Sequence, residues 1–178
     1  PIWIAHREGR AKDGRDLTEP AVIKMLTLSR ERGEAPETVL SDLNIVPLVI
    51  AYEVDPCDAL KAAELAAGEG YVKAEFEDVS SIARGITGDK GCVHLHFGEP
   101  LPADLSVEEV VSALDQQMAR QYRLYQTNRW AWEWLHGESV PAALAFHEGS
   151  VTEQSFRARI DSVPSEHRQW LLTMYANP

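Results

Sequence analysis

The chain has 178 residues, and none of its apolar runs approaches the about 18 to 20 residues that a membrane span requires. Hydrophobic residues make up 44% and charged residues 25% of the chain, which is typical of one globular domain with a sizeable core. The net charge of −11 argues against a nucleic-acid surface, because phosphate binding needs a basic face.

The first half of the chain alternates between strand-like and helix-like segments. Residues 2–5 predict a short strand, and Pro20 suits the first position of a helix that should end near Gly33. Residues 43–53 form a nearly continuous β-branched run, which favours a strand buried on both faces of a largely parallel sheet. Pro47 lies inside this run and cannot donate to a ladder, so it indicates a bulge or the entry of the strand.

A helix, a second helix and a third strand follow. Residues 58–67 are alanine-rich and stop at Gly68, which predicts a short helix. Residues 75–84 also predict a helix. The alternating stretch over residues 90–98 follows the turn signal Gly88-Asp89 and predicts a strand.

From about residue 105 onwards the chain predicts only helices. Ser106 and Glu109 form a capping box, and residues 128–135 predict the next helix. Three further helices are expected to begin at Ser139 before Pro141, at Ser150 with Glu153, and at Pro164. We therefore expect an α/β domain over residues 1–104, with a mixed, largely parallel sheet flanked by helices, and a C-terminal helical extension over residues 105–178.

The loop that follows the first expected strand is locally cationic. Residues 1–30 hold six basic and four acidic side chains, a balance of +2, so the other 148 residues carry −13. In the stretch REGRAKDG, glycine allows a ligand to approach the backbone, and arginine offers a planar fork matched to phosphate oxygens. A solvated turn would show similar residues, but the charge asymmetry favours a site that holds an anion.

Two stretches together resemble a known enzyme family. IAHREGRAKDG, followed by NIVPLVIAYE, resembles the third and fourth sequence blocks of the glycerophospholipid acyltransferases, which acylate glycerol-3-phosphate or lysophosphatidic acid. By this resemblance Glu8 and Gly9 match the family's Glu-Gly pair, and Arg10 matches the phosphate-binding arginine. Pro47 matches the proline of the fourth block and would line the substrate pocket. Arg7 and Lys12 would assist Arg10 with the phosphate.

The chain departs from the family pattern at three points. Arg7 stands where proline is usual, and one residue is missing between Gly9 and Arg10. The family's catalytic block is His-x-x-x-x-Asp, in which histidine is the general base and aspartate orients it. None of the six histidines has an aspartate five positions later. The resemblance covers about residues 1–100, so we expect the catalytic block upstream of Pro1 and no catalytic residue within this chain.

The resemblance implies a reaction and its partners. A fatty acyl group would pass from acyl-CoA or acyl-carrier protein to a glycerol phosphate hydroxyl in phospholipid synthesis, with no cofactor, no metal and no covalent enzyme intermediate. The two cysteines, Cys57 and Cys92, lack CxxC spacing and indicate a reducing compartment. The expected location is the cytoplasm, with peripheral attachment to the inner face of the cell membrane also open.

Two other functions remain open from the sequence. The chain could be a non-catalytic interaction or regulatory domain that kept an acyltransferase-like fold and lost the histidine. It could also belong to another family of phosphate-handling hydrolases, for which His6 and Glu8 would supply the acid and base near the loop.

Three further features have a structural and a functional interpretation. His94 and His96 share one face of a strand, which is half of a metal site, but no third ligand is visible and a polar strand face is favoured. Cys57 could be a nucleophile, although a small buried thiol is favoured. In the aromatic cluster of residues 130–134, Trp130 and Trp134 are four positions apart and are expected to pack on a core. Trp132 is then the residue that could contact an acyl chain or a membrane interface.

Overall fold

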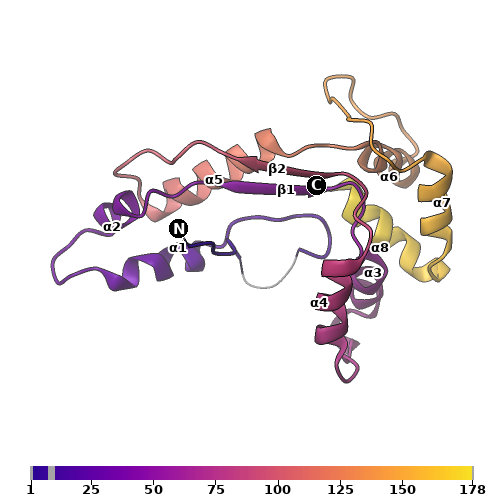
Figure 1. Ribbon diagram of the computed structural model, residues 1–178, viewed down its shortest axis with the longest axis horizontal. Coiled ribbons are helices and arrows are strands. Elements are labelled where there is room, and N and C mark those ends of the chain that lie inside the picture. Colours follow the sequence, from indigo (N-terminus) through magenta and orange to yellow (C-terminus); the bar gives the residue numbers. More distant parts are fainter. Residues whose placement is uncertain (1, 8–10, 178) are drawn as a thin grey trace. The chain divides into compact units, whose positions relative to one another are not determined.

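The structure is a computed structural model that describes residues 2–7 and 11–177, and it is mainly helical (Figure 1). The α-helices of this part of the chain are α1 (Pro20–Leu26), α2 (Pro36–Asp42), α3 (Asp58–Ala67), α4 (Glu77–Thr87), α5 (Val107–Gln121), α6 (Gln126–His136), α7 (Glu153–Asp161) and α8 (Ser165–Ala176). Two short 3-10 turns, η1 (Thr27–Ser29) and η2 (Gly68–Gly70), extend α1 and α3. The strands are β1 (Leu48–Tyr52) and β2 (Val93–Phe97).

The predicted α/β fold with a mixed, largely parallel sheet is wrong. The sheet of the described residues has two strands, β1 and β2, and they run antiparallel. Residues 2–5 are irregular rather than a strand. The β-branched run over residues 43–53 does form a strand at its centre, but a run of this kind specifies neither the number nor the direction of the strands beside it.

The hydrogen bonds at the two ends of the sheet fix its register. The Gly98 N–H donates to the Pro47 carbonyl at 2.9 Å, and the Glu53 N–H donates to the Cys92 carbonyl at 2.9 Å. This register places Leu48 opposite Phe97 and Ile50 opposite Leu95 on one face. On that face the side chains of β2 are exposed, whereas Val49 and Ala51 of β1 are buried on the other face. Pro47 stands at the entry of β1, where its missing N–H costs no ladder bond.

Local signals set most helix boundaries. Pro20 occupies the first turn of α1, and α3 ends at Gly68 as its sequence predicts. The Ser106 hydroxyl accepts from the Glu109 N–H, and the Glu109 carboxylate accepts from the Ser106 N–H at 2.9 Å, so the capping box of α5 is confirmed. No helix begins at residues 139–141 of the described chain, and α7 is capped by Thr152 rather than Ser150.

The chain divides into two compact units. Unit 1 contains the described residues of 1–10, 16–50 and 95–122, and unit 2 contains residues 11–15, 51–94 and 123–177. The core of unit 1 lies between α1, α2 and α5 and consists of the buried side chains Ile23, Leu40, Val110 and Leu114. Unit 2 is built mainly on α8, which packs against both α3 and α6.

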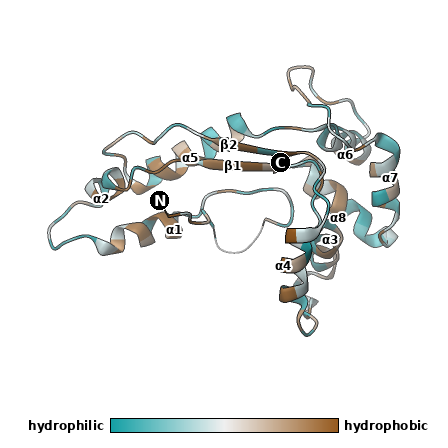
Figure 2. Ribbon diagram, viewed as in Figure 1, coloured by the Kyte–Doolittle hydropathy of each residue, from teal (hydrophilic) through white to brown (hydrophobic). Residues whose placement is uncertain are grey.

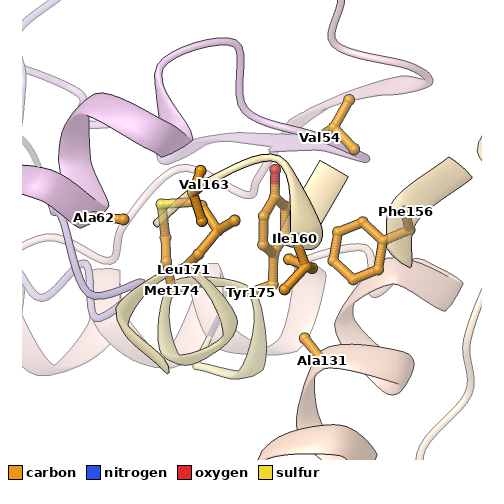
Figure 3. Close-up of a cluster of buried hydrophobic side chains, with 9 residues drawn as sticks. All are labelled: Val54, Ala62, Ala131, Phe156, Ile160, Val163, Leu171, Met174 and Tyr175. Carbon is orange, nitrogen blue, oxygen red and sulfur yellow. The ribbon is translucent and has the colours of Figure 1, made fainter. Parts of the chain in front are cut away.

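The core of unit 2 is larger and rich in aromatic side chains (Figure 3). Phe156 of α7 is fully buried, with the Tyr175 ring edge-on at 5.0 Å and the Trp134 ring stacked at 5.6 Å. Trp130 contacts the same ring at 6.1 Å, so Trp130 and Trp134 pack on the core as predicted. Of the helices described, none is long and apolar enough to cross a membrane.

Candidate functional site

The residues of the predicted phosphate site fall partly outside the described chain. Glu8, Gly9 and Arg10 lie outside the described residues. Arg7, in unit 1, has its guanidinium 3.8 Å from the carboxylate of Asp16. Lys12 belongs to unit 2 and forms an ion pair with Glu64 of α3. Two of the cations assigned to the phosphate therefore already have carboxylate partners within their own units.

The base of the cationic loop is closed by a polar network in unit 1. The His6 ring contacts the Thr18 hydroxyl through Nδ1 at 3.1 Å and the Asp16 carboxylate through Nε2 at 3.3 Å. The Glu19 N–H donates to the His6 carbonyl at 2.9 Å, and the Thr18 N–H donates to Asp115 of α5 at 2.9 Å. Within unit 1, these contacts hold residues 6–7 beside residues 16–19, just before α1 and at its N-cap.

The same network limits what His6 can do chemically. Both ring nitrogens contact side chains of the loop base, which fixes the ring in place. The Asp16–His6–Thr18 sequence of contacts resembles the geometry of a nucleophilic triad, but Thr18 is buried. A buried hydroxyl cannot reach a substrate, so the arrangement serves the loop and not a covalent reaction. Glu8, the proposed partner of His6 in a hydrolase, lies outside the described residues.

The second part of the loop, residues 11–15, packs on unit 2. A side chain at Gly14 would overlap the Met174 carbonyl at the end of α8, and its φ of +86° favours glycine. The Asn177 side chain donates to the Asp13 carbonyl at 3.2 Å. Gly14 is therefore required for a close approach to α8, whereas the sequence suggested that it served an anion.

A buried carboxylate that the sequence analysis assigned no role stands just after β1. Glu53 is 1% exposed, and its side chain accepts four hydrogen bonds. The donors are the N–H groups of Cys92 at 2.8 Å, Ser150 at 2.9 Å and Val151 at 2.7 Å, and the Ser150 hydroxyl at 3.0 Å. Its own carbonyl accepts from the buried Thr127 hydroxyl at 2.7 Å.

These bonds keep Glu53 ionised. Burial alone would raise the pKa of the Glu53 carboxyl, but the N–H groups of Cys92, Val151 and Ser150 and the Ser150 hydroxyl lower it below its usual value. A side chain at Gly91 or Gly149 would overlap the carboxylate, so both residues must be small. With four bonds made, Glu53 is a structural anion that ties β1 to residues 149–151, and it is not placed to act as a base.

A second buried ionic cluster joins three helices of unit 2. Asp58, at the start of α3, pairs with Arg159 of α7 and accepts from the Tyr175 hydroxyl of α8 at 2.7 Å. Arg159 also donates to the Asp55 carbonyl at 2.7 Å. Burial would lower the pKa of Arg159, but its bond to Asp58 raises the pKa overall. Burial, together with the charge of Asp58, raises the pKa of Tyr175 well above its usual value.

The remaining candidates from the sequence are placed as follows. Cys57 is buried, and its thiol donates to the Ser81 carbonyl of α4 at 3.4 Å, which is a packing role. Trp132 lies against His136 with a ring separation of 4.6 Å. His94 and His96 lie on the same face of β2. Within residues 2–7 and 11–177, no three His, Cys, Asp or Glu side chains gather closely enough to hold a metal ion.

The Glu53 cluster could not have been found from the sequence. Three of its four bonds come from residues 150 and 151, which are 97 and 98 positions further along the chain. Comparison of the chain with protein-family models, with curated proteins and with solved structures gives no match.

Proposed function

We propose that the protein is an acyltransferase that moves a fatty acyl group from acyl-CoA or acyl-carrier protein to glycerol-3-phosphate or lysophosphatidic acid. The observation that carries the proposal is the pairing of two blocks in one chain, IAHREGRAKDG at the loop and NIVPLVIAYE at β1. Each block alone is a weak signal. Together, with their order and spacing, they resemble the third and fourth blocks of the glycerophospholipid acyltransferases.

The reaction needs a base and an anchor for the acceptor. The acceptor hydroxyl attacks the thioester carbonyl, the C–S bond breaks, and the thiol leaves with the proton that the base took from the hydroxyl. The base is the histidine of a His-x-x-x-x-Asp block, which we place upstream of Pro1. Arg10 is the anchor, because a guanidinium matches two phosphate oxygens at once.

The loop base supports this assignment. Contacts from His6 and Arg7 to Asp16 and Thr18 hold residues 6–7 beside residues 16–18 within unit 1. Arg7 lies beside Asp16, and Lys12 pairs with Glu64. The resemblance assigns Arg10, which lies outside the described residues, the main contact with the phosphate. The balance of +2 over residues 1–30 would steer an anionic acceptor towards it.

The exposed face of the sheet also supports the proposal. Val93, Leu95 and Phe97 of β2 are large apolar side chains, and all three are exposed. A contiguous apolar strand face is normally covered by another element of the same domain or by a partner. We propose that the histidine-bearing part of the acyltransferase domain covers it. The same face favours the second candidate, an interaction domain without catalysis, in which a protein partner would cover it.

The experiment that separates the two candidates is an acyl-transfer assay on the protein from the complete gene. It should convert labelled glycerol-3-phosphate or lysophosphatidic acid to the acylated product with acyl-CoA or acyl-carrier protein as donor. The 178-residue chain alone is the control and should show no turnover. If the complete protein, folded and carrying its upstream region, acylates neither acceptor with either donor, the acyltransferase proposal is wrong and the interaction domain is favoured.

The proposed location follows from the reaction. Acyl-CoA and acyl-carrier protein are cytoplasmic donors, and the product is a lipid, so we place the enzyme in the cytoplasm with peripheral contact to the inner face of the cell membrane.

A further inference from the structure

Residues 11–15 of the cationic loop form a turn that is docked on unit 2. The Arg15 N–H donates to the Asp13 side chain at 3.1 Å, which closes the turn within the segment. Residues 11–14 are half-buried, although the segment has a single apolar side chain, that of Ala11. The helices that it contacts, α3 and α8, are of mixed hydropathy (Figure 2). Polar and steric contacts therefore have to hold the turn in place.

The first of these contacts engages the charge of Lys12. Lys12 forms an ion pair with Glu64 of α3, and the side chains of the two residues are 34% and 16% exposed. An anion that recruited Lys12 would have to compete with this carboxylate. It would also leave Glu64, which has little access to water, without this cation, and such a loss is costly. The ion pair therefore opposes a direct role of Lys12 in binding an anion.

The other contacts are made by the C-terminal end of α8. The Asn177 side chain donates to the Asp13 carbonyl at 3.2 Å. A side chain at Gly14 would begin 2.4 Å from the Met174 carbonyl oxygen and 3.0 Å from that of Asn177, so the two backbones are in close contact. The position of the turn is thus fixed at three successive residues, by charge at Lys12, by a hydrogen bond at Asp13 and by close packing at Gly14.

The sequence places this turn next to the predicted phosphate site. Residue 11 directly follows residues 8–10, to which the resemblance assigns the phosphate and which lie outside the described residues. Consecutive Cα atoms are about 3.8 Å apart, so a displacement of the turn is passed on to the residue before it. A residue that holds such a segment in place can affect binding without touching the ligand, because a small misplacement of a binding group weakens its contacts.

We propose that Lys12 is a positioning residue and not a phosphate ligand, and that Glu64 and Asn177 are the residues that hold its turn on α3 and α8. The docking of the turn rests on contacts within unit 2 and needs no assumption about the reaction. Its effect on the phosphate of the acceptor rests on the proposed function. The two parts are tested separately.

The first test is amide hydrogen exchange of the 178-residue chain, measured on peptides that cover residues 11–15. Lys12→Ala and Glu64→Gln should each speed exchange in this segment by roughly fivefold, the shift in an opening equilibrium that a partly exposed ion pair can produce. Lys12→Glu/Glu64→Lys, which exchanges the two charges, should restore slow exchange. The matched control is Asp78→Asn, which breaks the exposed ion pair of Asp78 with Lys73 in the same unit and should leave residues 11–15 unchanged.

The second test is the acyl-transfer kinetics of the protein from the complete gene, with glycerol-3-phosphate as the acceptor. Lys12→Ala and Glu64→Gln should raise the acceptor KM by the same factor, roughly fivefold, and leave kcat unchanged. The double variant should be no worse than either single variant, because both changes remove one contact. A lysine that bound the phosphate itself would give a different pattern, since Glu64→Gln would release Lys12 and lower the KM.

Three results would overturn the proposal. They are exchange in residues 11–15 that Glu64→Gln leaves unchanged, an acceptor KM that Lys12→Ala raises and Glu64→Gln lowers, and a KM that neither variant alters. Hydrogen exchange is measured without turnover, so failure of the proposed function is recognised separately. Faster exchange in both variants, in a complete protein that transfers no acyl group, would reject only the proposed function. Acyl transfer with unchanged exchange would reject only the positioning role of Lys12.

Discussion

At the scale of single residues, Glu53 shows how a carboxylate can be buried and remain charged. It is fixed by four donors and surrounded by two glycines, Gly91 and Gly149, that leave room only for its oxygens. Removing the charge would leave several buried N–H groups without a full partner, which is costly. The residue therefore stabilises the end of β1 and the start of α7, and through them the core of unit 2.

The pH dependence of stability should report this carboxylate. Because the pKa of Glu53 is lower in the folded chain than in the unfolded one, its stabilisation is complete above about pH 4.3 and is lost as the pH falls through the folded pKa. We expect Glu53→Gln to lower the free energy of unfolding by about 2–4 kcal/mol at pH 7. Urea unfolding of both proteins between pH 7 and pH 3 checks this.

The difference between the two proteins is the informative quantity, because other carboxyls also titrate in this range. It should shrink at the acid end. A difference that stays constant down to pH 3, or that is absent at pH 7, would contradict the role given to Glu53.

At the scale of elements, Asp58 and Arg159 connect α3 with α7, and the Tyr175 hydroxyl brings in α8. The Tyr175 hydroxyl donates a hydrogen bond to the Asp58 carboxylate and accepts one from the Asp55 N–H at 2.9 Å. This one buried hydroxyl therefore supplies a hydrogen-bond partner to both groups. Such a cluster specifies one arrangement of the helices, because every member depends on its partners.

Removing the cation of this cluster should lower the free energy of unfolding substantially. Arg159→Ala leaves the Asp58 carboxylate buried without its cation, and we expect a loss of about 3 kcal/mol in the free energy of unfolding. Arg157→Ala is the matched control on the same helix, since Arg157 lies over the Trp134 ring at 4.1 Å near the surface and should cost about 0.5–1 kcal/mol. Denaturant titration measures the free energy of unfolding of both variants. Equal losses in the two variants would show that the buried cluster stabilises the fold no more than the surface contact of Arg157.

Some helix ends were predictable because their signals are local, although α1 ends at Leu26 and not near Gly33 as predicted. Pro20, Gly68 and the Ser106/Glu109 box act within one turn of the backbone, and each appears in the structure where the sequence places it. Strand pairing was not predictable. The run over residues 43–53 indicates a strand, but its partner β2 lies about forty residues further on and pairs antiparallel. Hydrophobic alternation carries no information about direction.

The candidate site was predictable only in part, for a similar reason. The charge and glycines of residues 7–14 mark a loop, and the contacts of His6 with Asp16 and Thr18 are short-range in sequence. The sequence did not indicate that Lys12 would pair with Glu64, because that contact joins residues 52 positions apart.

At the scale of the whole molecule, the net charge opposes the binding of an anion, whereas the first thirty residues have a positive balance. The chain carries −11 in total, yet residues 1–30 carry +2. A glycerol phosphate acceptor is anionic, so its binding has to depend on a local cation strong enough to overcome the surrounding field. Arg10 is the residue that the proposal places there.

The most direct test of this account is the acceptor kinetics of Arg10→Ala in the protein from the complete gene. A charge-assisted contact with phosphate is worth about 1.5–3 kcal/mol, so kcat/KM for the acceptor should fall by roughly ten- to a hundredfold. Arg10→Lys should recover only part of the loss, because lysine keeps the charge without the fork. Arg32→Ala, an exposed arginine of unit 1, is the matched control and should change nothing. Unchanged acceptor kinetics in Arg10→Ala, with only acyl-donor use impaired, would contradict the account.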